Sequence, residues 1–301
     1  MPADAPPTVL LPWPDVAVPP GLSAAVYDGA GDPPDVRAVE LYVVPYGGSV
    51  GTLELIADLP ALRAVQVLTA GVDAVLPHVP AGVVLHSGRG LHDASTAEHA
   101  VGLILAAQRE LPRWVRDQAA GRWDPHYTRS LAGSRVLVVG FGSIGEALAA
   151  RLRPFEVDVV PLARRARPDQ GVLGVDALDA ELPRADVVVL LTPLTAATRG
   201  LLDRRRLALL PDGALLVNVA RGPVLDTGAL LAERGRVRAA LDVTDPEPLP
   251  PGHPLWGAPG VLLTPHVAGG SATFHPRARR FLADQLQRWA AGEPLHNRVE
   301  R

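Results

Sequence analysis

The stretch Val136–Leu148, VLVVGFGSIGEAL, decides the fold because it passes from an apolar strand into a glycine turn and then into a helix. Its glycines fit the spacing G-x-G-x-x-G, in which they provide a tight turn, room for a ligand to approach the backbone, and close packing of helix on strand. The start of the helix would direct free N–H groups at an anion. The stretch therefore predicts a binding site for the pyrophosphate of a dinucleotide, formed by Gly140, Phe141, Gly142, Ser143, Ile144 and Gly145.

Short apolar runs on both sides of this turn have the length and composition of strands that are buried on both faces. They are Thr8–Trp13, Ala24–Tyr27, Val39–Val44, Ala64–Leu68, Val83–His86, Arg135–Gly140, Val157–Leu162, Asp186–Thr192, Ala214–Ala220, Ala239–Val243 and Val261–Thr264. Helical segments are expected between and after them, at Ser95–Leu111, Asp203–Leu210, Thr227–Arg234 and Phe274–Ala291. This alternation predicts an α/β protein with doubly wound parallel sheets.

The segment Ser95–Leu111 has the clearest helix signals in the chain. Ser95 and Glu98 are spaced as a capping box, and Pro112 would end the helix. Its apolar middle is typical of a helix that links two domains. We expect an irregular connection or arm at Trp114–Ser130, a dinucleotide-binding domain at 95–270, and a discontinuous first domain made of 1–94 and 271–301.

The composition excludes several classes of protein. Hydrophobic residues make up 48% and charged residues 20% of the 301 positions, which is a globular balance. The net charge of −3 disfavours binding to nucleic acid or to an anionic membrane surface. Without cysteine there is no disulfide, no thiolate catalysis and no cysteine-built zinc site. The first residues lack a basic n-region, and no apolar run is long enough to span a bilayer, so a cytoplasmic location is expected.

Chemistry is expected where the strands of the second domain end, because ligands of open parallel sheets bind beyond the carboxyl ends of the strands. A cation, Arg221, a carboxylate, Glu247, and an imidazole, His266, follow three of these strands. An arginine can grip a carboxylate bidentately, a histidine can transfer a proton near neutral pH, and a glutamate can hold the imidazolium. Asp242 is a candidate acceptor for a nicotinamide carboxamide. Further candidates for contact with the cofactor are Thr192, Pro193 and Ala220.

Two glycine loops follow strands of the first domain, and each has two interpretations. They could present backbone N–H groups to a small anion, or they could be ordinary turns between strand and helix. Tyr46 could line a substrate pocket and admit a longer or aromatic side chain. The candidate substrate contacts in these loops are Tyr46, Gly47, Gly48, Ala70 and Gly71, in addition to Arg221 and His266.

Five motifs, VLVVGFGSIGEAL, LLTPLTAATRGLL, LLPDGALLVNVARGPVLD, AALDVTDPEPLPPGHPLW and VLLTPHVAGGS, closely resemble the D-isomer-specific 2-hydroxyacid dehydrogenases. The resemblance implies that Arg221, Glu247 and His266 are catalytic. It also implies a flavodoxin-like substrate domain, a Rossmann dinucleotide-binding domain, a cleft between them that closes over substrate, and a homodimer built through the dinucleotide-binding domain. Formate dehydrogenases of the superfamily carry glutamine at the glutamate position, so Glu247 disfavours formate oxidation.

The chain departs from this family at the end of the second strand of the dinucleotide-binding domain. Members that use NAD carry an acidic residue there, whereas this chain has Ala163 followed by Arg164 and Arg165. Two arginines favour a 2′-phosphate, so NADP(H) is the expected cofactor, with NAD(H) as the alternative. The expected activity is reduction of a small 2-keto acid such as glyoxylate, hydroxypyruvate or phenylpyruvate. The other hypothesis is a dinucleotide-sensing interaction protein, because transcriptional corepressors also resemble the family.

Overall fold

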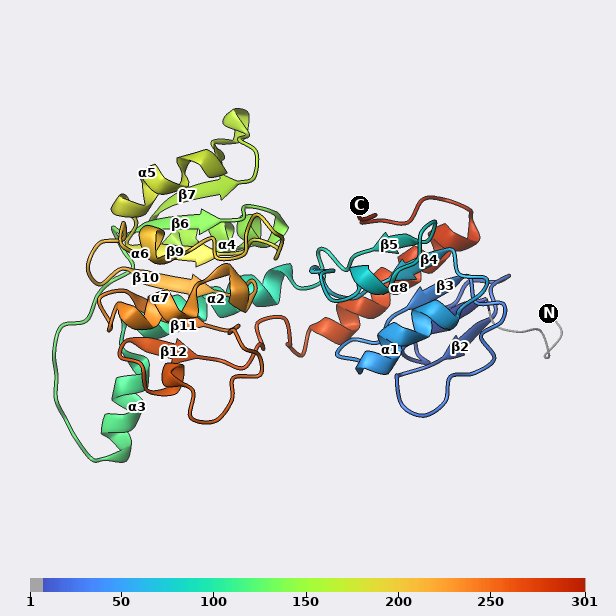
Figure 1. Ribbon diagram of the computed structural model, residues 1–301, viewed down its shortest axis with the longest axis horizontal. Coiled ribbons are helices and arrows are strands. Elements are labelled where there is room, and N and C mark those ends of the chain that lie inside the picture. Colours follow the sequence, from blue (N-terminus) through green and yellow to red (C-terminus); the bar gives the residue numbers. More distant parts are fainter. Residues whose placement is uncertain (1–7, 301) are drawn as a thin grey trace. The chain divides into compact units, whose positions relative to one another are not determined.

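The computed structural model describes residues 8–300, so residues 1–7 and Arg301 lie outside the description that follows (Figure 1). The chain forms two compact units, one made of Met1–His92 with Ala272–Arg301 and the other of Asp93–Ser271. These boundaries lie within two residues of those expected from the sequence. Each unit has its own all-parallel sheet, and the expected class of two parallel-sheet α/β domains is confirmed.

The second unit contains a seven-stranded sheet in the order β12-β11-β10-β9-β6-β7-β8. The strand order reverses between the neighbouring strands β6 and β9. After β6 the chain continues to β7 and β8 at one side of the sheet, and after β9 it continues to β10, β11 and β12 at the other side. Each strand expected here is present with its ends within two residues, and only the short edge strand β8 was missed. The strands are β6 (Arg135–Val139), β7 (Asp158–Ala163), β8 (Leu173–Gly174), β9 (Val187–Leu190), β10 (Leu215–Asn218), β11 (Arg238–Leu241) and β12 (Val261–Leu263).

Alternate strand residues of this sheet pack against two different layers of helices, which cover its two faces (Figure 1). Val136, Val187 and Leu215 belong to the cluster with α2 and α4, whereas Leu137, Val188 and Leu216 belong to the cluster with α5, α6 and α7. Burial on both faces explains why the strands are apolar throughout. The helices are α2 (Asp93–Gln108), α3 (Leu111–Ala119), α4 (Ser143–Leu152), α5 (Leu178–Glu181), α6 (Arg204–Leu207) and α7 (Thr227–Ala232).

Two expectations about the linking region were wrong. Helix α2 begins at Asp93, so Ser95 and Glu98 lie inside the helix and do not form a capping box at its start. The segment after it is not wholly irregular, because helix α3 occupies Leu111–Ala119. Pro112 stands in the first turn of α3, where the missing N–H of a proline costs no hydrogen bond, so this proline starts a new helix.

The first unit contains a five-stranded sheet in the order β2-β1-β3-β4-β5, the flavodoxin-like order. Its strands are β1 (Val9–Leu11), β2 (Ala24–Val26), β3 (Leu41–Val43), β4 (Ala64–Gln66) and β5 (Val84–His86). The C-terminal helix α8 (Phe274–Ala290) returns to this unit and covers one face of the sheet, packing Phe274, Ala278 and Leu282 against β1 and β3. The other face packs against the segment that holds the short helix α1 (Val50–Glu54).

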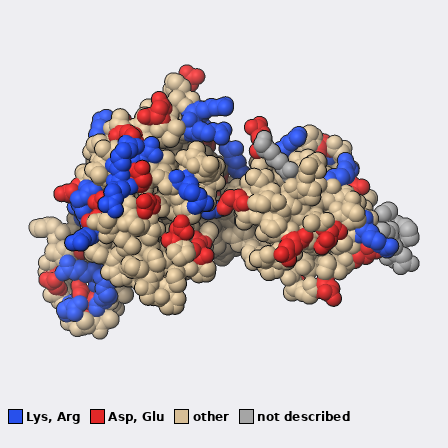
Figure 2. Space-filling model, in the orientation of Figure 1, with Lys and Arg blue, Asp and Glu red and all other residues tan. Residues whose placement is uncertain are grey.

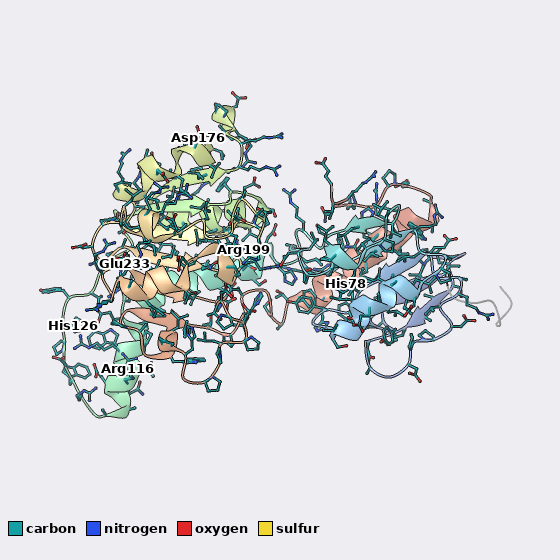
Figure 3. All side chains as sticks on the ribbon, in the orientation of Figure 1. His78, Arg116, His126, Asp176, Arg199 and Glu233 are labelled. Atoms are coloured by element: carbon teal, nitrogen blue, oxygen red, sulfur yellow. The ribbon has the colours of Figure 1, made fainter. Side chains whose placement is uncertain are left out.

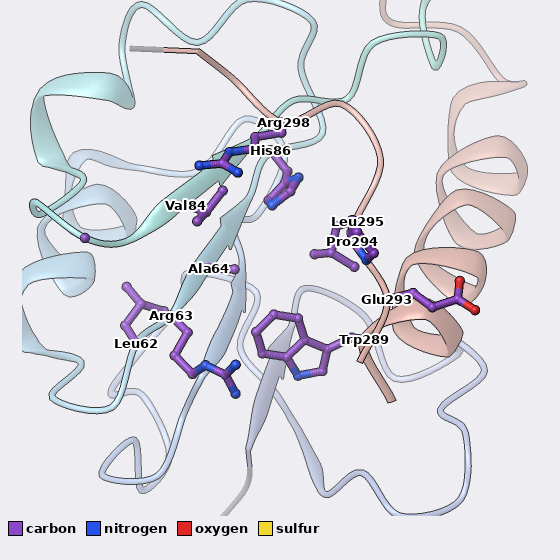
Figure 4. Close-up of a pocket in the computed structure, with 11 residues that line it drawn as sticks. Leu62, Arg63, Ala64, Val84, His86, Trp289, Glu293, Pro294, Leu295 and Arg298 are labelled. Carbon is purple, nitrogen blue, oxygen red and sulfur yellow. The ribbon is translucent and has the colours of Figure 1, made fainter. Parts of the chain in front are cut away.

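A hollow of about 440 Å³ opens at the amino ends of β4 and β5, between these strands and the end of α8 (Figure 4). Arg63 lies over the indole of Trp289, with 5.2 Å between the guanidinium carbon and the ring centroid. Ligands of parallel sheets bind at the opposite, carboxyl ends of the strands, and none of the candidate site residues lines this hollow.

Within residues 8–300, none of the helices combines the length and the apolar character that a membrane span requires.

Candidate active site

The glycine turn lies between β6 and α4 and is held by the neighbouring strand. The N–H groups of Gly140 and Phe141 both donate to the carbonyl of Leu162, at 2.8 and 2.9 Å. Gly140 has a φ of +102°, and a Cβ there would lie 2.6 Å from the backbone of Leu191 and Thr192, so only glycine fits. A Cβ on Gly142 would meet no atom within 4 Å. The chain therefore leaves open space above Gly142, beside the first turn of α4.

The turn packs beside the end of β9, at the point where the strand order reverses. Thr192 follows β9, and its buried Oγ1 has no hydrogen-bond partner among the residues the structure describes. A buried hydroxyl without a partner costs free energy, and a polar group of a bound ligand would satisfy it. The open space at Gly142, the uncapped start of α4 and the Thr192 hydroxyl together fit a dinucleotide at this switch point.

Three arginines follow β7. Arg164 and Arg165 are exposed and make no hydrogen bond or ion pair within residues 8–300. Figure 2 shows basic side chains projecting from the surface in the region where Figure 1 places the end of β7. Arg167 differs, because its Nη2 donates to the carbonyl of Phe141 at 2.6 Å and its guanidinium lies 5.8 Å from the Phe141 ring centroid. Sequence reasoning missed this third arginine, which ties the segment after β7 to the glycine turn.

His266 and Glu247 form a close pair. The Nδ1 atom of His266 lies 2.5 Å from Oε1 of Glu247, and both side chains are partly exposed, at 47% and 38%. Because Nδ1 is engaged, Nε2 is the nitrogen that can reach a substrate, and it bonds to no side chain or backbone group of the described chain. A carboxylate beside an imidazole stabilises the imidazolium, which is the proton donor that a reduction requires.

Asp242 holds the turn that presents His266. Its carboxylate is 1% exposed and accepts from the Thr264 hydroxyl at 2.6 Å and from the N–H groups of Val267 and Ala268 at 2.9 Å. His99 on α2 adds a contact, with Nε2 3.3 Å from Asp242 Oδ1. These bonds hold the turn in which His266 has a φ of +53°, a conformation that non-glycine residues rarely adopt. The structure thus shows that Asp242 accepts hydrogen bonds within the chain, and its suggested role as an acceptor for the nicotinamide carboxamide stays a prediction.

Arg221 follows β10 and reaches the same edge of the sheet. Its Nη1 donates to the Ala220 carbonyl at 2.8 Å, and Asn218 Nδ2 donates to the Arg221 carbonyl at 2.9 Å. The next residue, Gly222, packs directly on the backbone of Thr244, because a Cβ there would lie 1.8 Å from the Thr244 carbonyl oxygen. This contact places the loop that carries Arg221 against the loop that carries Glu247.

The candidate substrate residues of the first unit lie in two loops at the carboxyl edge of its sheet. Tyr46, Gly47 and Gly48 follow β3 in a turn closed by a 3.2 Å bond from the Gly48 N–H to the Pro45 carbonyl. Ala70 and Gly71 follow β4, where the Thr69 hydroxyl donates to the Gly71 carbonyl at 2.7 Å. Tyr46 is 38% exposed, and burial raises the pKa of its phenol above the usual value. Its ring is therefore neutral at physiological pH.

Comparison with known proteins identifies the family. Residues 101–268, more than half of the chain, match the model of the D-isomer specific 2-hydroxyacid dehydrogenase, NAD binding domain. The chain belongs to the D-isomer-specific 2-hydroxyacid dehydrogenase family. It is 35% identical to a glyoxylate reductase of Thermofilum pendens, in an alignment that covers 75% of this chain and 70% of that protein.

Two further relatives extend the match to nearly the whole chain. The structure of a D-isomer specific 2-hydroxyacid dehydrogenase from Xanthobacter autotrophicus Py2 in complex with NADPH and MES superposes with a TM-score of 0.81 and 33% identity, covering 98% of each chain. A D-3-phosphoglycerate dehydrogenase of Archaeoglobus fulgidus is 31% identical over 93% of this chain, although the chain spans only 55% of that protein's length. The chain is therefore an NAD(P)-dependent 2-hydroxyacid oxidoreductase.

Proposed function

We propose that this enzyme is an NADPH-preferring reductase that converts small 2-keto acids into D-2-hydroxy acids. The observation that carries this proposal is the 2.5 Å pair of His266 and Glu247, in loops at the sheet edge where Arg221 and the glycine turn also lie. The similarity to a glyoxylate reductase supports the substrate class. The similarity to a structure that holds NADPH supports the cofactor.

The roles of the three side chains follow from their chemistry. A dinucleotide bound at the glycine turn would supply the hydride that the keto carbon of the substrate receives. Arg221 binds the substrate carboxylate and polarises the carbonyl. His266 donates the Nε2 proton to the carbonyl oxygen, and Glu247 stabilises the imidazolium before the transfer. Asp242 and His99 are positioning residues, since they hold the turn that presents His266.

Turnover tests the proposal directly. Oxidation of NADPH and NADH is followed by absorbance with glyoxylate, hydroxypyruvate, pyruvate, 2-ketobutyrate and phenylpyruvate. We expect measurable reduction of at least one of these acids and D-stereochemistry in the product. Absence of turnover with every acid and both dinucleotides would contradict the proposed activity. The alternative, a dinucleotide-sensing interaction protein, would then become the better explanation.

The preference for NADPH is expected to depend on the exposed arginines after β7. Replacing both Arg164 and Arg165 with alanine removes two cations from the predicted 2′-phosphate site, whereas NADH lacks that phosphate. We expect the ratio of kcat/KM for NADPH to kcat/KM for NADH to fall at least about tenfold, or ~1.4 kcal/mol. Arg153→Ala with Arg204→Ala serves as a control for the loss of two charges. A ratio that stays the same in the Arg164→Ala/Arg165→Ala variant would remove these arginines from the cofactor site.

The homodimer implied by the family resemblance is proposed to form through the arm of the second unit, defined here as residues 111–127. The arm exposes large apolar side chains that a monomer would leave in water: Leu111 (49%), Val115 (65%), Trp123 (95%) and Tyr127 (104%). Figure 3 labels Arg116 and His126 on the arm. Apolar anchors among mixed charges are typical of a surface that binds a second copy of the same chain.

Substitution of Trp123 tests this interface. We expect the wild type to elute as a dimer in size-exclusion chromatography with light scattering. Trp123→Asp should weaken association at least about tenfold, because a buried aromatic anchor contributes strongly to an interface and an unpaired carboxylate opposes its burial. The matched control is Trp256→Asp, since Trp256 is also an exposed indole (60%) of the second unit but lies outside the arm. A wild-type monomer at micromolar concentration would contradict the proposal.

A further inference from the structure

The hollow beside β4 and β5 is a concave surface that contains none of the residues assigned to the reaction. Its volume of about 440 Å³ is sufficient for a small organic molecule. Its walls come from β4, β5 and the residues before them, and from the end of α8 with the segment that follows it. Figure 4 shows Arg63 and Trp289 at one end of the hollow and His86 and Arg298 at the other. All of the lining belongs to the first unit, so the hollow is complete within that unit.

His86 and Arg298 project side by side. The segment after α8 runs antiparallel to β5 with Arg298 directly opposite His86, and the Val299 N–H donates to the Leu85 carbonyl at 2.8 Å. Opposite residues of an antiparallel pair point to the same face of a sheet, with their Cβ atoms about 5 Å apart. The Arg298 side chain is exposed and makes no hydrogen bond or ion pair within residues 8–300. Its guanidinium is therefore available to an anion beside the imidazole.

The imidazole of His86 offers a hydrogen-bond acceptor to the hollow. His86 is 5% exposed, and its Nδ1 lies 2.9 Å from the carbonyl oxygen of His296. Because a carbonyl only accepts, Nδ1 carries the proton, and Nε2 of the neutral ring is an acceptor. Burial lowers the pKa of His86, so the ring is neutral at physiological pH. Nε2 bonds to no group of the described chain and is not fully buried, so it opens into the hollow that this side chain lines.

The charges of the lining favour an anion at the His86 end. Arg63 is compensated, because its Nη1 lies 3.0 Å from Oε2 of Glu40. The acidic residue of the lining, Glu293, lies 3.4 Å from Nη1 of Arg288, and Figure 4 shows its carboxylate directed away from the other labelled side chains. Arg298 is thus the cation of the lining that has no counter-ion among residues 8–300. The wall between the two ends is apolar and consists of Leu62, Ala64, Val84, Pro294 and Leu295.

We propose that this hollow binds a small 2-hydroxy acid. Arg298 binds the carboxylate bidentately, and the hydroxyl on the adjacent carbon donates to Nε2 of His86, while the side chain of the ligand lies against the apolar wall. A 2-keto acid cannot make the second bond, because its carbonyl oxygen only accepts. The site therefore distinguishes a 2-hydroxy acid from the 2-keto acid with the same side chain. A 2-hydroxy acid is the product class of the proposed reaction, but the inference does not depend on that reaction.

The first experiment compares three ligands by isothermal titration calorimetry. The protein is the full chain with Arg221→Ala and without dinucleotide, because this substitution removes the carboxylate contact proposed for the active site. The ligands share one isobutyl side chain and are 2-hydroxy-4-methylpentanoate, 4-methyl-2-oxopentanoate and 4-methylpentanoate. We expect the hydroxy acid to bind at least about threefold more tightly than the other two, since it alone makes the bond to Nε2. Equal Kd values, or no binding of the hydroxy acid at millimolar concentration, would overturn the inference.

The second experiment locates the bound acid with further substitutions in the same protein. Arg298→Ala should weaken binding of the hydroxy acid at least about tenfold, because a charge-assisted pair is lost. The matched control is Arg280→Ala, which removes an exposed arginine of α8 outside the hollow and should change Kd less than about twofold. Unchanged affinity in Arg298→Ala would place the acid elsewhere and contradict the proposed site.

His86→Asn tests the hydrogen bond to the hydroxyl. The asparagine amide keeps a donor for the His296 carbonyl at the place of Nδ1 but has no counterpart of Nε2, so the preference for the hydroxy acid over the keto acid should disappear. A preference that persists would show that Nε2 does not read the hydroxyl. Thermal unfolding shows whether each variant is folded, and Arg298→Ala at its exposed position decides the site even if His86→Asn unfolds. Absence of turnover with every 2-keto acid would refute the proposed function and leave these binding results unaffected.

Discussion

Replacing Arg221 with alanine is expected to lower kcat/KM for 2-keto acid reduction by about a thousandfold or more, or ~4 kcal/mol. The guanidinium is the cation that the sheet edge offers to both the substrate carboxylate and the carbonyl oxygen on which negative charge develops. Alanine removes both interactions, and water replaces them poorly. Steady-state kinetics with the best substrate of the panel measure the loss. A decrease of less than about tenfold would exclude Arg221 from the site.

Two controls make this result specific. Arg221→Lys keeps the charge but cannot bind a carboxylate bidentately, so it should recover only part of the activity. Arg204→Ala removes an exposed arginine from α6 and should leave kcat/KM within about twofold of the wild type. The Kd for the dinucleotide should also stay near the wild-type value in Arg221→Ala, because Arg221 is assigned to the substrate. A lost affinity for the dinucleotide would instead indicate that the substitution disturbed the whole edge of the sheet.

The second large effect is expected at the pair of His266 and Glu247. His266→Gln removes the proton donor and should lower kcat by about a thousandfold, within the range for a general acid. Glu247→Gln leaves the imidazole in place but removes the carboxylate that holds the imidazolium, so we expect a smaller loss of about ten- to a hundredfold. The double variant should be no slower than His266→Gln alone, because Glu247 acts only through His266.

The double-mutant cycle distinguishes this arrangement from two independent contributions. Losses that multiply in the double variant would show that Glu247 contributes to the reaction without His266. The matched control is Asp245→Asn, which neutralises an exposed carboxylate of the same loop. This carboxylate makes no hydrogen bond or ion pair within the described chain, so the substitution should change kcat by less than about twofold. A comparable loss in Asp245→Asn would assign the effect to the charge of the loop and not to the imidazole pair.

Much of this enzyme could be predicted from local sequence. The strands were found because residues buried on both faces of a parallel sheet form short, wholly apolar runs, and each expected strand is present. The location of Arg221, Glu247 and His266 at one edge of the sheet was predicted in the same way, since the carboxyl ends of parallel strands all lie at one edge. The glycine turn could be recognised because glycines at this spacing are needed where a side chain would not fit. Gly140 is such a position, since it has a positive φ and lies in close contact with the backbone of Leu191.

Other features depended on contacts between residues that are far apart in the chain. Ser95 and Glu98 have the spacing of a capping box, yet α2 begins earlier because packing of the helix against α4 and the sheet overrides the local signal. Asp242 resembles a ligand-binding carboxylate in the sequence, and only the fold shows that its oxygens also accept hydrogen bonds from the turn before and after His266. Nothing in the sequence distinguishes Arg167 from the nearby Arg164 and Arg165. Only the structure shows that Arg167 donates a hydrogen bond to the carbonyl of Phe141.

By itself, the sequence determined the family, the two parallel sheets, the glycine turn and the three polar side chains at the sheet edge. The family follows from the resemblance of five motifs, and the other features arise from periodicity and spacing along the chain. Only the tertiary structure decided which side chain holds His266 in its unusual conformation, which arginine is tied to the glycine turn, and that His86 and Arg298 lie side by side. The physical reason is that hydrogen-bond satisfaction and strand pairing join residues as far apart as His86 and Arg298, and no local pattern encodes such a pair.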